Sequence, residues 1–141
     1  MIRVERGKPD LLFRVRHDYI VIANESGRDR YQTVTPSYDY QILDLQEREL
    51  LSYHWHPSGV SPVTHPHLDL TSRVRPFEID DPANPSRKPT SISFSDMHIP
   101  TGPVLFEHVI RLLIEEFGVV PLRPDWDEIL LRNEELVRAN D

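Results

Sequence analysis

Apolar and polar residues alternate with a period of two through the first half of the chain. This pattern predicts β-strands, because successive side chains of a strand point to opposite faces of a sheet. β-Rich runs lie at residues 11–16, 19–22 and 31–35, with a turn at 24–27 and Pro36 closing or bending the third run. The clearest alternation covers residues 38–45, 48–56 and 65–74.

The last third of the chain follows the 3.6-residue period of an amphipathic helix. Apolar residues form one broad arc between Pro103, suited to a first helical position, and Gly118, suited to ending a helix. A second helix is predicted from Asp125, where Glu128 completes a capping box. The Pro-rich residues 75–90 predict a long surface loop, followed by a short edge strand at 91–94.

Strands first and helices last predict an α+β fold. We expect an antiparallel β-meander of four to six strands followed by two C-terminal helices packed on one face. The length of 141 residues fits a single domain, residues 1–141.

Composition narrows the function. The absence of cysteine excludes thiolate zinc sites, thiol nucleophiles and disulfides. The net charge of −7 argues against non-specific binding of nucleic acid, which needs cations at the phosphates. No apolar run approaches the roughly 18–20 residues of a membrane span. The first residues lack the features of a signal peptide, so we expect a cytoplasmic protein that does not enter a membrane.

Histidines gather on the polar side of the predicted sheet. A hairpin that pairs His56 with His65 also places His54 opposite His67, and all apolar residues of the two strands then share the other side. The preceding hairpin, with a tight turn at residues 46–47, places Asp39 opposite His54 and an aromatic ladder on the core side. The predicted polar face holds Asp39, Ser52, His54, His56, His65, His67 and Asp69.

Opposed imidazoles at this spacing suit two kinds of chemistry. His54, His56, His65 and His67 could hold a zinc ion, with Asp39 or Asp69 orienting a ligand. Without a metal, His54 and His67 could serve as general base and general acid in phosphodiester cleavage, with Arg14 or Arg16 holding a phosphate.

A plainer interpretation stands beside these two. The histidines could be ordinary polar residues of a solvated sheet face, because pairs at i, i+2 on strands are a weaker metal signal than a helical His-Glu-x-x-His. His98 lies near the start of the first helix, where it could reach the cluster or serve only in a cap or loop.

Three blocks of the sequence resemble a group of small uncharacterised bacterial proteins over roughly residues 38–130. The blocks are Tyr53-His54-Trp55-His56-Pro57, His65-Pro66-His67-Leu68 and His98-Ile99-Pro100-Thr101-Gly102. The chain departs from that group at Asp69, where a second histidine is expected, and this puts a site made only of histidines in doubt. The order of strands and helices, with a His-x-His strand, is also similar to the TumE family of toxin components, a likeness of layout.

Two functions remain open at this stage. In the first, the chain is a toxin-like component of a toxin–antitoxin pair, with a cognate antitoxin as partner. It would act on RNA or a nucleotide as a His-dependent nuclease or phosphodiesterase, with His54 and His67 catalytic and His56, His65, Asp69, Asp39 and His98 supporting them. In the second, the chain is a non-catalytic protein-binding module that could also bind zinc. The oligomeric state is not predicted.

Overall fold

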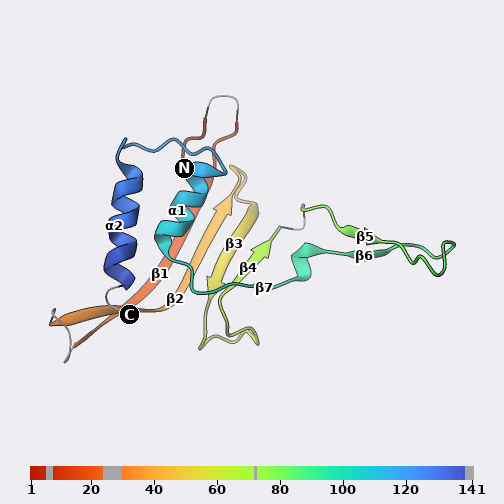
Figure 1. Cartoon of the computed structure of the whole chain (residues 1–141), viewed down its shortest axis with the longest axis horizontal. Coiled ribbons are helices and arrows are strands. Elements are labelled where there is room, and N and C mark those ends of the chain that lie inside the picture. The colour runs from red at the N-terminus through yellow and green to blue at the C-terminus, as the bar shows by residue number, and fades with distance from the viewer. Residues whose placement is uncertain (6–7, 24–29, 72, 139–141) are drawn as a thin grey trace.

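The computed structural model describes residues 1–5, 8–23, 30–71 and 73–138. Its elements are β1 (Leu12–Ala23), β2 (Tyr31–Leu43), β3 (Glu49–Trp55), β4 (His67–Leu70), β5 (Phe77–Ile79), β6 (Thr90–Ile92), the 3-10 helix η1 (Phe94–Asp96), β7 (Ile99–Pro100), α1 (Phe106–Glu115) and α2 (Trp126–Arg138). The predicted α+β fold is confirmed: a five-stranded antiparallel meander in the order β1-β2-β3-β4-β7 precedes two helices (Figure 1). Within the described residues, no helix is long and apolar enough to cross a membrane.

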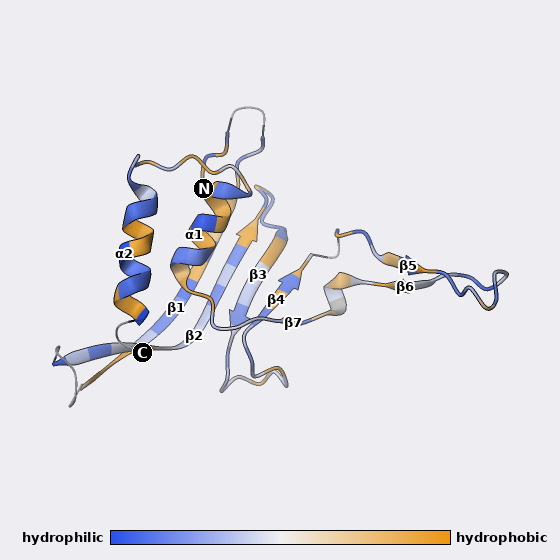
Figure 2. Ribbon diagram, viewed as in Figure 1, coloured by the Kyte–Doolittle hydropathy of each residue, from blue (hydrophilic) through white to orange (hydrophobic). Residues whose placement is uncertain are grey.

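One face of the sheet packs against α1, and this contact forms the core. Val109 and Leu113 of α1 are buried against alternate residues of β2, namely Tyr38, Tyr40 and Ile42. Hydrophobic residues of α1 and α2 gather on one side of each helix (Figure 2). Each buried aliphatic side chain stabilises the fold by about 1.5–3 kcal/mol. Because Tyr38, Tyr40 and Ile42 point inward, the residues between them point to the face without helices.

Tyr38 ties the core to the segment that leads into α1. Its ring stacks on Tyr40 with centroids 4.7 Å apart, and its hydroxyl accepts a hydrogen bond from the Val104 backbone N–H at 2.9 Å. Burial raises the pKa of Tyr38 above its ordinary value. The predicted aromatic ladder is confirmed, since Tyr38 pairs with Trp55 and Tyr40 pairs with Tyr53.

The predicted registers of both hairpins are confirmed along the paired strands. Asp39 lies opposite His54 across β2 and β3, and His54 lies opposite His67 across β3 and β4. The β3–β4 ladder ends at this last pair, so the predicted pairing of His56 with His65 falls beyond it. Pro66, which has no N–H to donate, lies just outside β4.

The early strands are longer than predicted. β1 is one strand where two runs were expected, and β2 continues through Pro36. The ladder between them shifts register between Asp18 and Ile20, opposite Pro36, so the proline bends the pair and does not end it. The tight turn expected at residues 46–47 is a wider loop closed by a backbone hydrogen bond from Asp44 to Arg48 at 2.9 Å. The turn expected at residues 24–27 lies outside the described residues.

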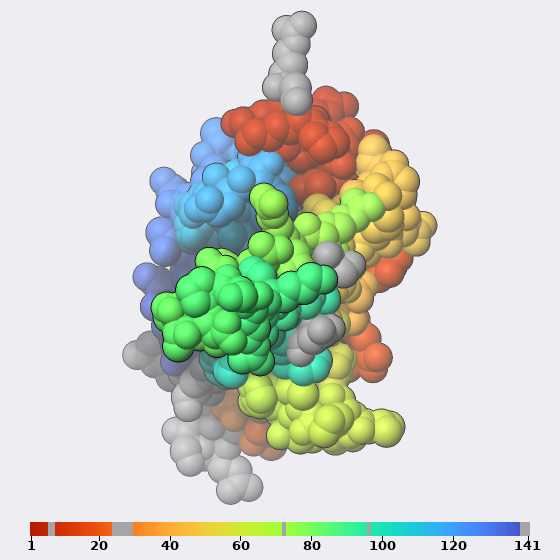
Figure 3. Space-filling model, turned by 90° about the vertical axis from the view of Figure 1, so that its right-hand side faces the viewer, coloured from red at the N-terminus to blue at the C-terminus, as the bar shows by residue number. Residues whose placement is uncertain are grey.

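The segment predicted as a long surface loop, residues 75–90, is exposed along nearly all its length, but it contains β5 and the first residue of β6. β5 and β6 pair with each other as a separate two-stranded arm, which projects toward the viewer in Figure 3. The edge strand expected at residues 91–94 is divided between β6 and η1. β4 stops at Leu70, short of the predicted residue 74, and the unpredicted β7 pairs beside it.

The first helix begins later than predicted, whereas the second begins directly after Asp125, as predicted. α1 starts at Phe106 and not at Pro103, because residues before it are held extended by the Tyr38–Val104 hydrogen bond. The helix stops before Gly118 as predicted, and this glycine has a φ of 72° that suits a residue without Cβ. α2 follows Asp125, whose carboxylate accepts from the Arg123 guanidinium at 2.8 and 2.9 Å. The capping box with Glu128 stays a prediction.

Candidate functional site

The face of the sheet opposite α1 carries a continuous row of polar residues. The row crosses four neighbouring strands, and each of its residues lies directly opposite the next: Arg16 on β1, Asp39 on β2, His54 on β3 and His67 on β4. Directly opposed side chains of neighbouring strands have Cβ atoms about 4.5–5.5 Å apart. The period-two pattern therefore brings residues far apart in the chain into one site.

Asp69 lies at the centre of this site. Its Oδ2 is 3.6 Å from Nε2 of both His54 and His67, and its Oδ1 is 3.0 Å from Nδ1 of His98. The carboxylate therefore contacts imidazoles from β3, from β4 and from the residue before β7. Asp69 thus joins the histidines together.

His67 is held in one orientation and is nearly buried. Its ring centroid lies 5.6 Å from that of His54, 6.0 Å from His65 and 5.0 Å from His98. These rings leave it 6% exposed, which corrects our expectation of a solvent-facing side chain. Nδ1 lies 3.0 Å from the His65 carbonyl oxygen, and a carbonyl can only accept. Nδ1 therefore carries the proton, and Nε2 presents a lone pair in the neutral ring.

His54 is oriented by a chain of hydrogen bonds. The Ser52 hydroxyl donates to Oε1 of Glu49 at 2.8 Å, because an ionised carboxylate only accepts. Ser52 Oγ then accepts from Nε2 of His54 at 2.7 Å. The other ring nitrogen, Nδ1, lies 3.3 Å from Oδ1 of Asp39. Ser52 is fully buried within these contacts, although it lies on the polar face.

Two groups of side chains have the donor types and spacing to hold a metal ion. The first is Asp39, His54 and His56, and the second is His67, Asp69 and His98; within each, one ligand atom per residue lies within 4.8 Å of the others. Three of the four histidines of the predicted set are thus divided between two groups, each with an aspartate. His65 belongs to neither, although its backbone carbonyl accepts from His67 and its ring packs against the His67 ring.

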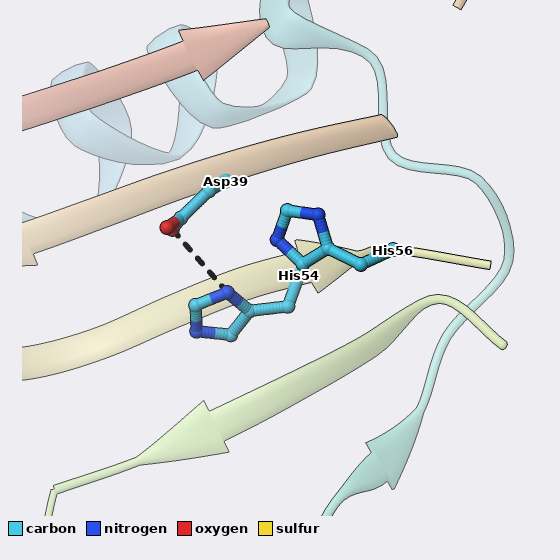
Figure 4. A group of neighbouring side chains, drawn as sticks. All are labelled: Asp39, His54 and His56. Atoms are coloured by element: carbon cyan, nitrogen blue, oxygen red, sulfur yellow. Dashed lines mark ion pairs between the residues drawn. The ribbon is translucent and has the colours of Figure 1, made fainter. Parts of the chain in front are cut away.

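Figure 4 shows the first group. The Asp39 carboxylate reaches from β2 toward the His54 ring on β3, and the His56 ring lies beside it. His54 lies on β3 and His56 is the first residue after its end, and their ring centroids are 6.1 Å apart.

The arginines predicted to hold a phosphate lie on the same face and already have partners. Arg14 contacts Glu47 at 3.1 Å, and Arg16 contacts Asp18 at 3.2 Å. A hydrogen bond from the Ser37 hydroxyl, followed by the contact with Arg16, lowers the pKa of Asp18. These exposed pairs hold each arginine only weakly, at about 0–1 kcal/mol, so an incoming phosphate can replace the carboxylate.

Sequence reasoning missed Glu49, which fixes the Ser52 hydroxyl, and left His98 between two roles. His98 joins the site because β7 pairs with β4, placing Ile99 opposite Leu68. One feature of the sequence could have indicated the strand after His98: Pro100, two residues later, is a residue type that suits an edge strand. Comparison of the chain with protein-family models, curated proteins and solved structures gives no match, so the site is interpreted from its own geometry.

Proposed function

We propose that the histidine-bearing sheet face cleaves phosphodiester bonds of RNA or a nucleotide, and that the chain is a toxin-like component of a toxin–antitoxin pair. The observation that carries the proposal is the meeting of His54 and His67 at one Asp69 oxygen, 3.6 Å from each Nε2. Two imidazoles on neighbouring strands can reach opposite sides of one phosphate. The toxin–antitoxin setting rests on the resemblance in layout to TumE proteins.

In this proposal the two histidines have different roles on RNA. Nε2 of His67 is the base, because Nδ1 holds its proton against the His65 carbonyl at 3.0 Å. It removes the proton of a 2′-hydroxyl, whose oxygen attacks the adjacent phosphorus. Protonated His54 gives its proton to the 5′-oxygen as the P–O5′ bond breaks. The products are a 2′,3′-cyclic phosphate and a free 5′-hydroxyl, and no metal or cofactor enters the balance.

The test uses metal-free protein, chelator and an end-labelled RNA. We expect products with 2′,3′-cyclic phosphate ends, and a loss of about 10²-fold or more in His54→Gln and in His67→Gln, the usual size of one acid–base contribution. His108→Gln is the matched control, since His108 lies on α1 and contacts Glu134 at 3.8 Å. Thermal unfolding must accompany each variant because His67 is buried.

Two results would overturn the proposal. One is an RNA and cyclic-nucleotide panel left intact by folded wild-type protein, and the other is cleavage that persists in the His54→Gln/His67→Gln double variant. Expression in a bacterial host adds a second readout, because a toxin should arrest growth and both variants should relieve the arrest.

A non-catalytic binding module is the second candidate, and the charge of the molecule favours it. The net charge of −7 opposes RNA, whereas a basic protein partner would be attracted. On this proposal the wild-type protein leaves RNA intact and forms a stable complex with a partner encoded beside it.

A further inference from the structure

The carboxylate of Asp39 has an oxygen that no protein group satisfies. Its Oδ1 is buried and has no hydrogen-bond partner among the described residues. Leaving a buried acceptor unpaired costs about 1–3 kcal/mol, more for a charged group, so such an atom points to a missing partner. The nearest nitrogen in an ion pair with it is Nδ1 of His54 at 3.3 Å, which does not complete a hydrogen bond.

The tautomer of His54 places an acceptor beside that oxygen. Ser52 commits its proton to Glu49 and can only accept from His54, so Nε2 of the neutral ring carries the hydrogen. Nδ1 is then a lone pair, and it faces the unpaired oxygen of Asp39. Two acceptors at this distance repel each other unless a positive charge lies between them, either a second ring proton or a metal ion.

The spacing suits a tetrahedral metal site. Zinc bonds of about 2.0–2.2 Å to nitrogen and oxygen place neighbouring ligand atoms about 3.3–3.6 Å apart. Nδ1 of His54 and Oδ1 of Asp39 are 3.3 Å apart. His56, just after the end of β3, supplies a third donor, and one ligand atom from each of the three residues lies within 4.8 Å of the others (Figure 4).

We propose that Asp39, His54 and His56 bind a zinc ion, with water as its fourth ligand. Imidazole and carboxylate donors together suit zinc and similar transition metals, whereas magnesium and calcium take oxygen ligands. The hydrogen bond from Nε2 of His54 to Ser52 orients the ligand ring, as second-shell contacts do in known zinc sites.

The second group is a weaker candidate for the ion. Oδ1 of Asp69 lies 3.0 Å from Nδ1 of His98, and among the described residues neither Asp69 oxygen is a buried atom without a hydrogen-bond partner. The Nδ1 proton of His98 can satisfy Oδ1 of Asp69 directly. Asp39 is the carboxylate whose oxygen lacks such a partner.

The zinc site goes beyond the proposed phosphodiester cleavage and does not require it. A proton and a zinc ion cannot occupy Nδ1 of His54 together. Saturating zinc is therefore expected to suppress cleavage that uses protonated His54, and zinc binding can be measured whether or not RNA is cut.

The experiment titrates zinc alone into metal-free, tag-free full-length protein in competition with a chromophoric chelator. We expect one zinc per chain, and a tetrahedral absorption spectrum when cobalt(II) replaces it. Asp39→Asn and His56→Gln should each weaken zinc binding by at least tenfold, since even indirect partners of a metal contribute about 10–100-fold. His65→Gln and His108→Gln are matched controls that should bind zinc as the wild type does.

Three outcomes would overturn the zinc site. Zinc binding could be absent from the folded wild type, could be unchanged in both Asp39→Asn and His56→Gln, or could be lost in His98→Gln while these two retain it. Circular dichroism of each variant separates loss of the site from loss of the fold. His67→Gln distinguishes the two proposals, because it removes the base for RNA cleavage and leaves the three zinc ligands in place.

Discussion

The two nitrogens of His54 lie in different surroundings, and this asymmetry sets what the site can do. Nε2 belongs to a hydrogen-bond chain through Ser52 to Glu49, whereas Nδ1 faces Asp39. The first contact fixes the ring and its tautomer, and the second leaves a lone pair beside a carboxylate. Proton transfer and metal binding therefore compete at one atom.

Asp44 gives a prediction about acid stability at a position away from the site. Its carboxylate accepts from the Arg48 side chain at 2.7 Å and from the backbone N–H groups of Gln46 and Arg48 at 2.9 and 3.0 Å. These bonds, the Arg48 side chain first, lower the pKa of Asp44 from 3.8 to about 2. The folded state thus favours the ionised form more than the unfolded chain does.

The stabilising contribution of Asp44 is full above roughly pH 5 and is lost as the pH falls through 3.8 toward about 2. Urea unfolding of wild type and Asp44→Asn at a series of pH values measures it. The difference in unfolding free energy should shrink across this range. A difference that is constant from neutral pH to the lowest pH at which the protein folds would contradict the prediction. Arg48→Gln should raise the pKa of Asp44 in the folded state, and the pH range over which the difference in unfolding free energy changes should then be narrower.

Single residues show where sequence reasoning stops. Asp69 stands where a histidine was expected, and this argued against the prediction of a site made only of histidines. In the structure its carboxylate contacts three histidines. The burial of His67 could not be predicted from alternation, because it comes from neighbouring rings on the same polar face. A period of two assigns a face, and it does not determine how crowded that face is.

Among the elements, the registers of strands with clear alternation were predictable, and the shortest strands were not. Alternation over several residues fixed the registers of β2, β3 and β4, since a slip by one residue would expose the core. β5, β6 and β7 have three residues or fewer, too few to show a period. β7 nevertheless matters most to the site, because its pairing with β4 brings in His98.

The arm formed by β5 and β6 should be dispensable for folding. It is a separate two-stranded sheet whose first and last residues, Phe77 and Ile92, lie opposite each other. An isolated hairpin is only marginally stable in water, and the main ring contact between the arm and the rest is Phe77 on Phe94 at 4.8 Å.

We expect replacement of residues 77–92 by a short Gly-Ser linker to change the unfolding free energy by about 1 kcal/mol or less, or roughly 4 °C in melting temperature. Differential scanning calorimetry measures this. Leu113→Ala is the comparison, because truncating a buried leucine should cost about 2–5 kcal/mol. A loss of stability by the linker variant as large as that of Leu113→Ala would show that the arm is part of the core structure.

At the scale of the whole molecule, charge limits how RNA can bind. The chain carries 23 acidic and 16 basic residues, so phosphates meet net repulsion at long range. On the histidine face, β1 contributes two arginines beside the site: Arg14, opposite Gln41, and Arg16, opposite Asp39. Proposed cleavage therefore depends on few phosphate contacts, in contrast to the many contacts of dedicated nucleic-acid-binding proteins.

This limit predicts a shallow salt dependence for RNA binding. Each neutralised phosphate of a single strand contributes about −0.7 to the slope of log affinity against log salt concentration, so two arginines give about −1.4. Fluorescence anisotropy with the cleavage-deficient His67→Gln variant and a labelled RNA measures the slope without loss of substrate. Arg14→Gln and Arg16→Gln should each make it shallower by about 0.7, whereas Arg138→Gln, on the far end of α2, should leave it unchanged. A slope steeper than about −4 would require many more phosphate contacts than this face can offer, and RNA would then bind elsewhere on the molecule.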